Sequence, residues 1–186
     1  IGFYGLYAAL NAEHLLATVA DSVIGGEYEG PLVEWVRALD EGRADAGVAG
    51  VHRRGRPLAL DDGGRARAAL GRLAFPAPDR DLLAAPGKYV HLERDGARVP
   101  AAYVEASRGC AHLCRHCPIP PVYGGRFHVV PVDIVLEDVR RQVRAGARHV
   151  TFGDPDFLNG PGHVLPIVRA LHHEHPGVTF DVTTKI

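Results

Sequence analysis

The sequence has no methionine, and it has only three cysteines and one tryptophan in 186 residues. A chain without methionine lacks an initiator of its own, so we expect it to begin in mid-sequence. Its last residues, 180–186, read as a strand without a terminating turn. The sequence therefore predicts a fragment, with further structure expected at both ends.

An excess of charge of one sign is also missing, because 21 Lys and Arg residues are scattered among 22 Asp and Glu residues. No basic block indicates a nucleic-acid surface. No apolar run approaches the ~18–20 residues of a membrane span, and no signal peptide opens the chain. With an ordinary globular composition, these features predict a cytoplasmic protein without a membrane or nucleic-acid partner.

The N-terminal part alternates helical and strand patterns. Residues 5–17 predict a helix, 21–26 a short strand and 31–41 a second helix with an apolar stripe. The strand ends in Gly25 and Gly26, and small residues at such a position let a ligand approach the backbone. An α/β fold is indicated.

The middle of the chain, 46–98, has a looser pattern, and Gly, Pro, Asp and Arg are frequent over 61–87. We expect a hairpin within 48–60, around Arg54-Gly55, and a short helix near 65–73. Most of this part is predicted to be a connector.

The last ninety residues regain a regular order of strands and helices. We expect strands over 88–93, 101–106, 149–152 and 178–183, a turn at 94–96, a helix over 131–145, and a helix that ends near 175–177 with Pro166 in its first turn or at a kink. Repeated strand–loop–helix order with apolar strands predicts parallel βαβ units.

All three cysteines lie within eight residues, as Cys110-Ala-His-Leu-Cys114-Arg-His-Cys117. Disulfide frameworks spread an even number of cysteines along secreted chains, so this cluster favours a metal site. One short loop with these spacings can hold three thiolates around a 4Fe–4S cluster and leave one iron open to an amine and a carboxylate. The alternative is a zinc-binding interaction module, in which His112, His116 or a distant His completes a Cys3His site.

Residues 107–117, Ser-Arg-Gly-Cys-Ala-His-Leu-Cys-Arg-His-Cys, closely resemble the signature loop of the radical SAM superfamily. The CxxxCxxC spacing, the Arg-Gly before the first Cys and the ring-bearing residue before the third all match. The resemblance covers about residues 99–186. It implies the first half of a partial (β/α)6 barrel, with Cys110, Cys114 and Cys117 as ligands of a 4Fe–4S cluster that binds S-adenosylmethionine (SAM).

The same resemblance implies cofactor contacts outside the three cysteines. His116 takes the place of a residue beside the adenine of SAM. The loop of Gly153, Asp154 and Pro155 stands where the family has a Gly-Gly-Glu-Pro-like segment that holds the methionyl amino group. Because this loop departs from that pattern, only its backbone role carries over.

Residues 1–45 resemble the C-terminal part of a doubly wound, Rossmann-like domain of the cobalamin-binding type. Gly25 and Gly26 then correspond to glycines that line the nucleotide tail of cobalamin. The Asp-x-His-x-x-Gly segment that supplies an axial His in many such domains is not found in this sequence. Segments at 105–110 and 153–159 further resemble radical SAM proteins named for a Cys/selenocysteine–Ala–Glu–Pro tail.

The activity implied by the resemblance is reductive cleavage of SAM to methionine and a 5′-deoxyadenosyl radical, which abstracts hydrogen from a substrate. An external one-electron reductant is an expected partner, and the substrate is a small molecule or a peptide. Cobalamin, if bound, implies methyl transfer to an unactivated carbon.

Overall fold

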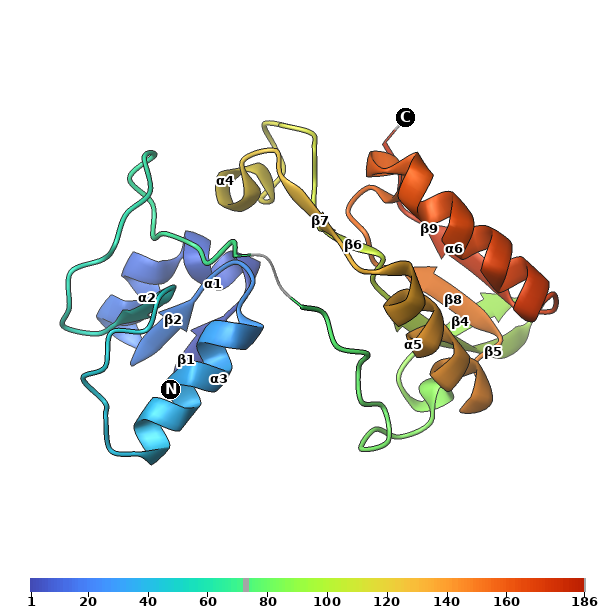
Figure 1. The fold of residues 1–186 in the computed structure, drawn as a ribbon, viewed down its shortest axis with the longest axis horizontal. Helices are drawn as coiled ribbons and strands as arrows, with labels where there is room; N and C mark the ends of the chain where they lie inside the picture. The colour runs from blue at the N-terminus through green and yellow to red at the C-terminus, as the bar shows by residue number, and fades with distance from the viewer. Residues whose placement is uncertain (72–73, 186) are drawn as a thin grey trace. The chain divides into compact units, whose positions relative to one another are not determined.

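The structure is a computed structural model that describes residues 1–71 and 74–185. Its chain divides into two compact units. The first holds Ile1–Leu73 and His112–Gly125, and the second holds Ala74–Ala111 and Arg126–Ile186, with residues 72, 73 and 186 outside the described part. Each unit is an α/β structure, as the sequence predicts, and each is considered by itself (Figure 1).

The first unit has a three-stranded sheet in the order β1-β2-β3. Strand β2 pairs in parallel with β1 and antiparallel with β3. The elements of this unit are β1 (Gly2–Tyr4), α1 (Leu6–Leu10), α2 (Ala12–Thr18), β2 (Ser22–Ile24), α3 (Glu29–Asp40), β3 (Val51–Arg53) and α4 (Pro120–Tyr123).

All three residues of β2, Ser22–Ile24, are buried, and Val23 and Ile24 supply apolar side chains to its two faces. Val23 packs in one cluster with Leu16 and alanines of α1 and α2, whereas Ile24 packs in another with Trp35 of α3. Successive side chains of a strand point to opposite faces, so helices cover both sides of this sheet.

Three expectations for the first unit need correction. The helix predicted over 5–17 is two helices, α1 and α2, that meet at Asn11, whose side-chain amide donates to the Tyr7 carbonyl at 2.8 Å. The hairpin predicted within 48–60 is wrong, because β3 pairs with β2 instead. No helix forms in 65–71, where Ala69 makes a parallel bridge with Gly26; positions 72 and 73 of that prediction lie outside the described residues.

The second unit contains a four-stranded sheet in the order β4-β5-β8-β9 and a two-stranded ribbon of β6 and β7. Its elements are η1 (Pro86–Lys88), β4 (His91–Arg94), β5 (Ala97–Val104), β6 (Ser107–Gly109), β7 (Phe127–Val129), α5 (Val132–Arg144), β8 (His149–Phe152), η2 (Phe157–Asn159), α6 (Pro161–Glu174) and β9 (Thr179–Val182).

Strands β5, β8 and β9 are parallel, which confirms the predicted βαβ units. Figure 1 shows α5 and α6 side by side over one face of these strands, and their apolar residues close the main core of the unit. The predicted turn at 94–96 is confirmed as the hairpin between β4 and β5, with Asp95 and Gly96 both at positive φ. Pro166 lies inside α6 rather than in its first turn.

Residues 46–98, predicted as a connector, contribute β3 to the first sheet and β4 to the second. Within the second unit, Arg80 binds α5 through a bidentate ion pair. Its Nε and Nη2 donate to the two carboxylate oxygens of buried Asp138, at 2.9 and 2.7 Å. The same interaction raises the pKa of Arg80.

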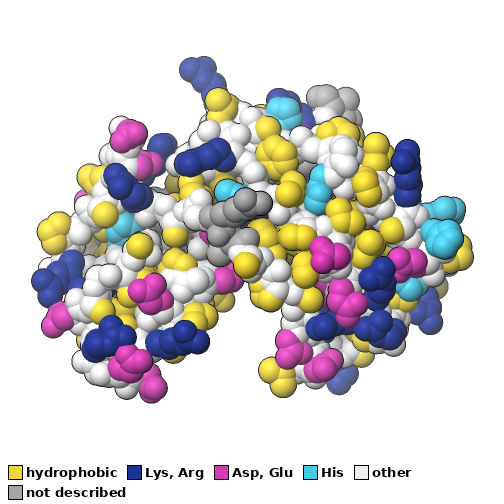
Figure 2. All heavy atoms as spheres, viewed as in Figure 1, with side chains coloured by type: hydrophobic (Ala, Val, Ile, Leu, Met, Phe, Trp, Pro, Cys, Tyr) yellow, Lys and Arg dark blue, Asp and Glu magenta, His cyan; other side chains and the backbone are white. Residues whose placement is uncertain are grey.

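Positive and negative side chains are interspersed on the face of each unit that Figure 2 shows. No helix among the described residues is long and apolar enough to cross a membrane.

Candidate functional site

The loops that follow β5, β8 and β9 carry most of the predicted site residues. The Cys loop comes after β5, Gly153–Asp156 after β8, and Thr183–Lys185 after β9. Because these strands are parallel, the three loops start at the same edge of the sheet, and this carboxyl edge is where open α/β sheets bind ligands.

The Cys loop leaves the sheet through a short ribbon. Strands β6 and β7 pair antiparallel, and the amide of Cys110 donates to the Arg126 carbonyl at 3.2 Å. This ribbon was not predicted, since three-residue strands carry little periodicity of their own.

Asp154 fixes the start of the loop. Its carboxylate is 1% exposed and accepts hydrogen bonds from the Ala106 amide at 3.0 Å and the Ser107 hydroxyl at 2.5 Å. Each carboxylate oxygen therefore has a partner within the second unit. The predicted contact of Asp154 with SAM is not tested by this geometry and stays a prediction.

Cys110 is 7% exposed, and its thiol lies 3.8 Å from the side-chain oxygen of Asn159. The same oxygen accepts a hydrogen bond from the Ala111 amide at 3.1 Å. Asn159 was not among the predicted site residues, because its role depends on η2 bringing it back to a loop 48 residues earlier in the sequence.

Cys114 and Cys117 belong to the first unit, and the amide of Cys117 donates to the carbonyl of Cys114 at 3.2 Å. Both are partly buried, His116 between them is exposed, and none of the three cysteines is in a disulfide. Among residues 1–71 and 74–185, no three His, Cys, Asp or Glu side chains are grouped as metal ligands. The ligand roles of the cysteines and the adenine contact of His116 stay predictions.

Gly153 continues β8 beyond its last residue, and its amide donates to the Val104 carbonyl at 2.9 Å. A Cβ atom here would lie 1.8 Å from the hydroxyl oxygen of Tyr103, so the position has no room for a larger residue. That hydroxyl donates to the Gly153 carbonyl at 3.4 Å. Desolvation, followed by the charges of Glu105 and Asp154, raises the pKa of Tyr103. Pro155 is partly buried next in the chain, and the cofactor contacts of Gly153 and Pro155 stay predictions.

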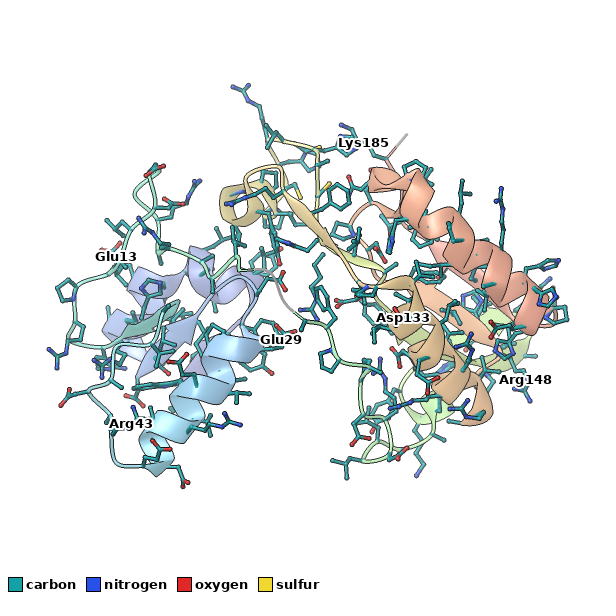
Figure 3. All side chains as sticks on the ribbon, in the orientation of Figure 1. Glu13, Glu29, Arg43, Asp133, Arg148 and Lys185 are labelled. Atoms are coloured by element: carbon teal, nitrogen blue, oxygen red, sulfur yellow. The ribbon has the colours of Figure 1, made fainter. Side chains whose placement is uncertain are left out.

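Asp156 ties the end of β8 to the residues after β9. Its carboxylate accepts from the Leu158 amide, the Thr184 hydroxyl and the Lys185 amide at 3.2, 3.1 and 3.4 Å. Lys185 is labelled in Figure 3 beyond β9. Asp156 is also the N-cap of η2, where its carboxylate accepts from the Leu158 amide.

In the first unit, Gly25 and Gly26 face other parts of the same unit. A Cβ on Gly25 would lie 2.4 Å from the Cβ of Ala9, and a Cβ on Gly26 would lie 2.1 Å from the Ala69 carbonyl oxygen. Gly26 also has φ +75°, a conformation that favours glycine. A pocket of this unit is lined by residues that include His52 and Ala69, but neither glycine. Packing against the chain itself thus accounts for both glycines, and their predicted contact with cobalamin is not tested.

No family model matches the chain. A ribosomal protein uS12 methylthiotransferase of Nitratidesulfovibrio vulgaris is 31% identical over 83 residues, which are 39% of this chain and 19% of that protein. A protein of Pyrococcus horikoshii named as an uncharacterized methyltransferase is 27% identical over 173 residues, 89% of this chain and 35% of that protein.

Two solved structures of TsrM, a radical S-adenosylmethionine methyltransferase from Kitasatospora setae, have a similar fold. One, with cobalamin and a 4Fe–4S cluster bound, has a TM-score of 0.64 and 19% identity. The other, with tryptophan substrate and a SAM analogue bound, has a TM-score of 0.58 and 20% identity. Each match covers 94% of this chain and 34% of the TsrM chain.

The chain spans between 19% and 35% of the length of these relatives. At identities near 20%, the likeness to TsrM concerns the fold. The sequence similarity to a methylthiotransferase and the fold shared with TsrM agree with the resemblance of the Cys loop to the radical SAM superfamily.

Proposed function

We propose that the protein containing this chain is a radical SAM enzyme, with Cys110, Cys114 and Cys117 as ligands of a 4Fe–4S cluster. The observation that carries the proposal is the CxxxCxxC loop at the carboxyl end of β5, in a fold that matches TsrM with a TM-score of 0.64. When bound, such a cluster supplies one electron, taken from an external reductant, that cleaves SAM into methionine and a 5′-deoxyadenosyl radical.

The donor set fits this cluster. All three thiols are free, and soft thiolates are the preferred ligands of iron–sulfur clusters. The amide oxygen of Asn159 lies beside Cys110, and it also holds the next backbone amide in place. Asp154 fixes the two residues that lead into the loop. These contacts orient the first ligand before any metal arrives.

His116 is exposed on the Cys loop, where its ring is free to stack on an adenine. The backbone of Gly153 and Asp154 offers carbonyl oxygens at the end of β8, the position proposed for the amino group of SAM. The substrate, a small molecule or a peptide, is proposed to bind at the same edge of the sheet.

Methyl transfer is the proposed reaction subclass, supported by the names of the similar proteins. Cobalamin is a proposed further cofactor, supported by the TsrM structure that has it bound. Gly25 and Gly26 are proposed to line its nucleotide tail, although their packing against Ala9 and Ala69 already accounts for glycine at both positions. No step is assigned to cobalamin. Stoichiometric uptake of hydroxocobalamin by the full-length protein tests this point directly.

The central experiment is iron, sulfide and zinc analysis of the full-length protein purified without oxygen. We expect four irons and four sulfides per chain, the content of one 4Fe–4S cluster, and loss of both in the Cys114→Ala variant. His112→Ala is the matched control in the same loop, because it removes a candidate zinc ligand and leaves the thiolates intact. If the His112→Ala variant keeps the iron content of the wild type, a Cys3His site that depends on His112 is excluded.

The activity is then tested with dithionite and SAM, by measuring 5′-deoxyadenosine. His116→Ala should raise the KM for SAM while the iron content stays that of the wild type. Zinc without sulfide, or an intact cluster that yields no 5′-deoxyadenosine, would overturn the proposed function in favour of a metal-binding interaction module.

A further inference from the structure

The downstream end of the Cys loop is anchored inside the first unit. Helix α4 begins at Pro120, three residues after Cys117, and packs against α1. Val122 and Tyr123 of α4 form a buried cluster with Ala9 of α1. A four-residue helix is too short to be stable by itself, so its position depends on these tertiary contacts.

One of these contacts is a buried polar pair. The Tyr123 hydroxyl donates to the Glu27 carboxylate at 2.8 Å. Glu27 is 2% exposed and Tyr123 is 9% exposed. A carboxylate withdrawn from water is costly unless it is hydrogen-bonded, and a bond to a charged acceptor is stronger than one between neutral groups.

Glu27 is itself held by the backbone around it. It follows Gly26 after β2, and its amide donates to the Ala69 carbonyl at 2.6 Å. The parallel bridge between Gly26 and Ala69 fixes the same turn. The carboxylate that accepts from Tyr123 therefore lies on a turn directly after β2 that is fixed by backbone hydrogen bonds to Ala69.

We propose that Glu27 is a positioning residue for the Cys loop, an inference that rests on the proposed function. Through Tyr123 it holds α4, and α4 holds the turn that carries Cys114 and Cys117. The Glu27–Tyr123 pair thus limits the positions that these two thiols can take before the cluster forms. Cys110 has its own anchor in Asn159 and does not depend on Glu27.

The test uses the full-length protein in two states, metal-free and cluster-loaded. In the metal-free state, alkylation of each cysteine by iodoacetamide is followed by mass spectrometry. We expect Tyr123→Phe and Glu27→Leu to speed the alkylation of Cys114 and Cys117 about fivefold, the factor that corresponds to about 1 kcal/mol for a hydrogen bond. Cys110 serves as the internal reference, and its rate should not change.

Glu27→Gln keeps an acceptor for the Tyr123 hydroxyl, so it should restore most of the wild-type protection. Tyr7→Phe, at an exposed tyrosine of α1, is the matched control and should behave as the wild type. In the cluster-loaded state, Tyr123→Phe should lower the iron content and alter the electron paramagnetic resonance spectrum of the reduced cluster.

Equal alkylation of Cys114 and Cys117 in Tyr123→Phe, Glu27→Leu and Tyr7→Phe would overturn the proposal. A uniform increase at all three cysteines would also overturn it, because that result indicates general unfolding. A wild-type protein that holds no iron–sulfur cluster would instead refute the proposed function, and the alkylation rates would still decide whether Glu27 positions the loop.

Discussion

Replacing Asp154 by Ala should destabilise the second unit strongly, because this carboxylate serves two donors in the interior. It accepts from the Ala106 amide and the Ser107 hydroxyl, and it is 1% exposed. A buried donor left without a partner costs about 1–3 kcal/mol. Two such donors give an expected loss of about 2–6 kcal/mol, against a total stability of roughly 5–15 kcal/mol for a typical domain.

The substitution Asp154→Asn separates this explanation from a general loss of packing. Its oxygen can accept from the Ala106 amide, while its amide can donate to the Ser107 hydroxyl, which is able to reverse its direction. We therefore expect Asn to cost about 1 kcal/mol, the net worth of one hydrogen bond, and much less than Ala.

The assay is urea unfolding of the metal-free protein, followed by far-ultraviolet circular dichroism. Asp133→Asn, at an exposed position in the first turn of α5 (Figure 3), is the control, with an expected change below about 1 kcal/mol. An Asp154→Ala variant as stable as this control would refute the reasoning. So would equal losses for Asn and Ala at position 154.

Two further predictions concern other parts of the chain. Arg140 donates to Glu174 and lowers the pKa of that carboxyl from its ordinary value of 4.5. The pair therefore stabilises the folded state above this pH, and its contribution is lost as the pH falls through the lower folded-state pKa. In urea unfolding at about pH 6, the free energy of unfolding of the wild type should exceed that of Glu174→Gln by up to about 1 kcal/mol, the usual limit for a partly exposed pair. This difference should vanish in acid, and a difference that grows in acid would contradict the prediction. Gly26→Ala should lower the free energy of unfolding by about 1–3 kcal/mol more than Gly42→Ala does. Both glycines have positive φ, but only at Gly26 would the new Cβ lie 2.1 Å from a backbone oxygen, that of Ala69. The fluorescence of the single tryptophan, which lies in the first unit, measures this difference, and equal costs would show that Ala69 does not restrict the site.

Helix α5, strand β8 and strand β9 could be located from the sequence because their apolar residues recur at the period of the element. Strand β8, His149–Phe152, has the predicted bounds, and α5 differs by one residue at each end. The three cysteines could also be recognised as a motif from the sequence, because all of them lie within one loop of eight residues. Local patterns of this kind need no knowledge of the rest of the fold.

The partners of short or irregular segments were decided only by the tertiary structure. Strand β3 pairs with β2 rather than with its own neighbours, and Ala69 fills the space beside Gly26. Each of these contacts joins residues far apart in sequence, and three-residue strands have no periodicity that would reveal their partner.

The same division holds for the candidate site. The sequence by itself determined which side chains could bind a cluster, since thiol chemistry and spacing are properties of the loop. Only the tertiary structure showed what holds that loop: Asn159 and Asp154 at its start, and the buried Glu27–Tyr123 pair at its end. A hydrogen bond between residues 96 positions apart depends on how the intervening chain folds, and no local pattern encodes it.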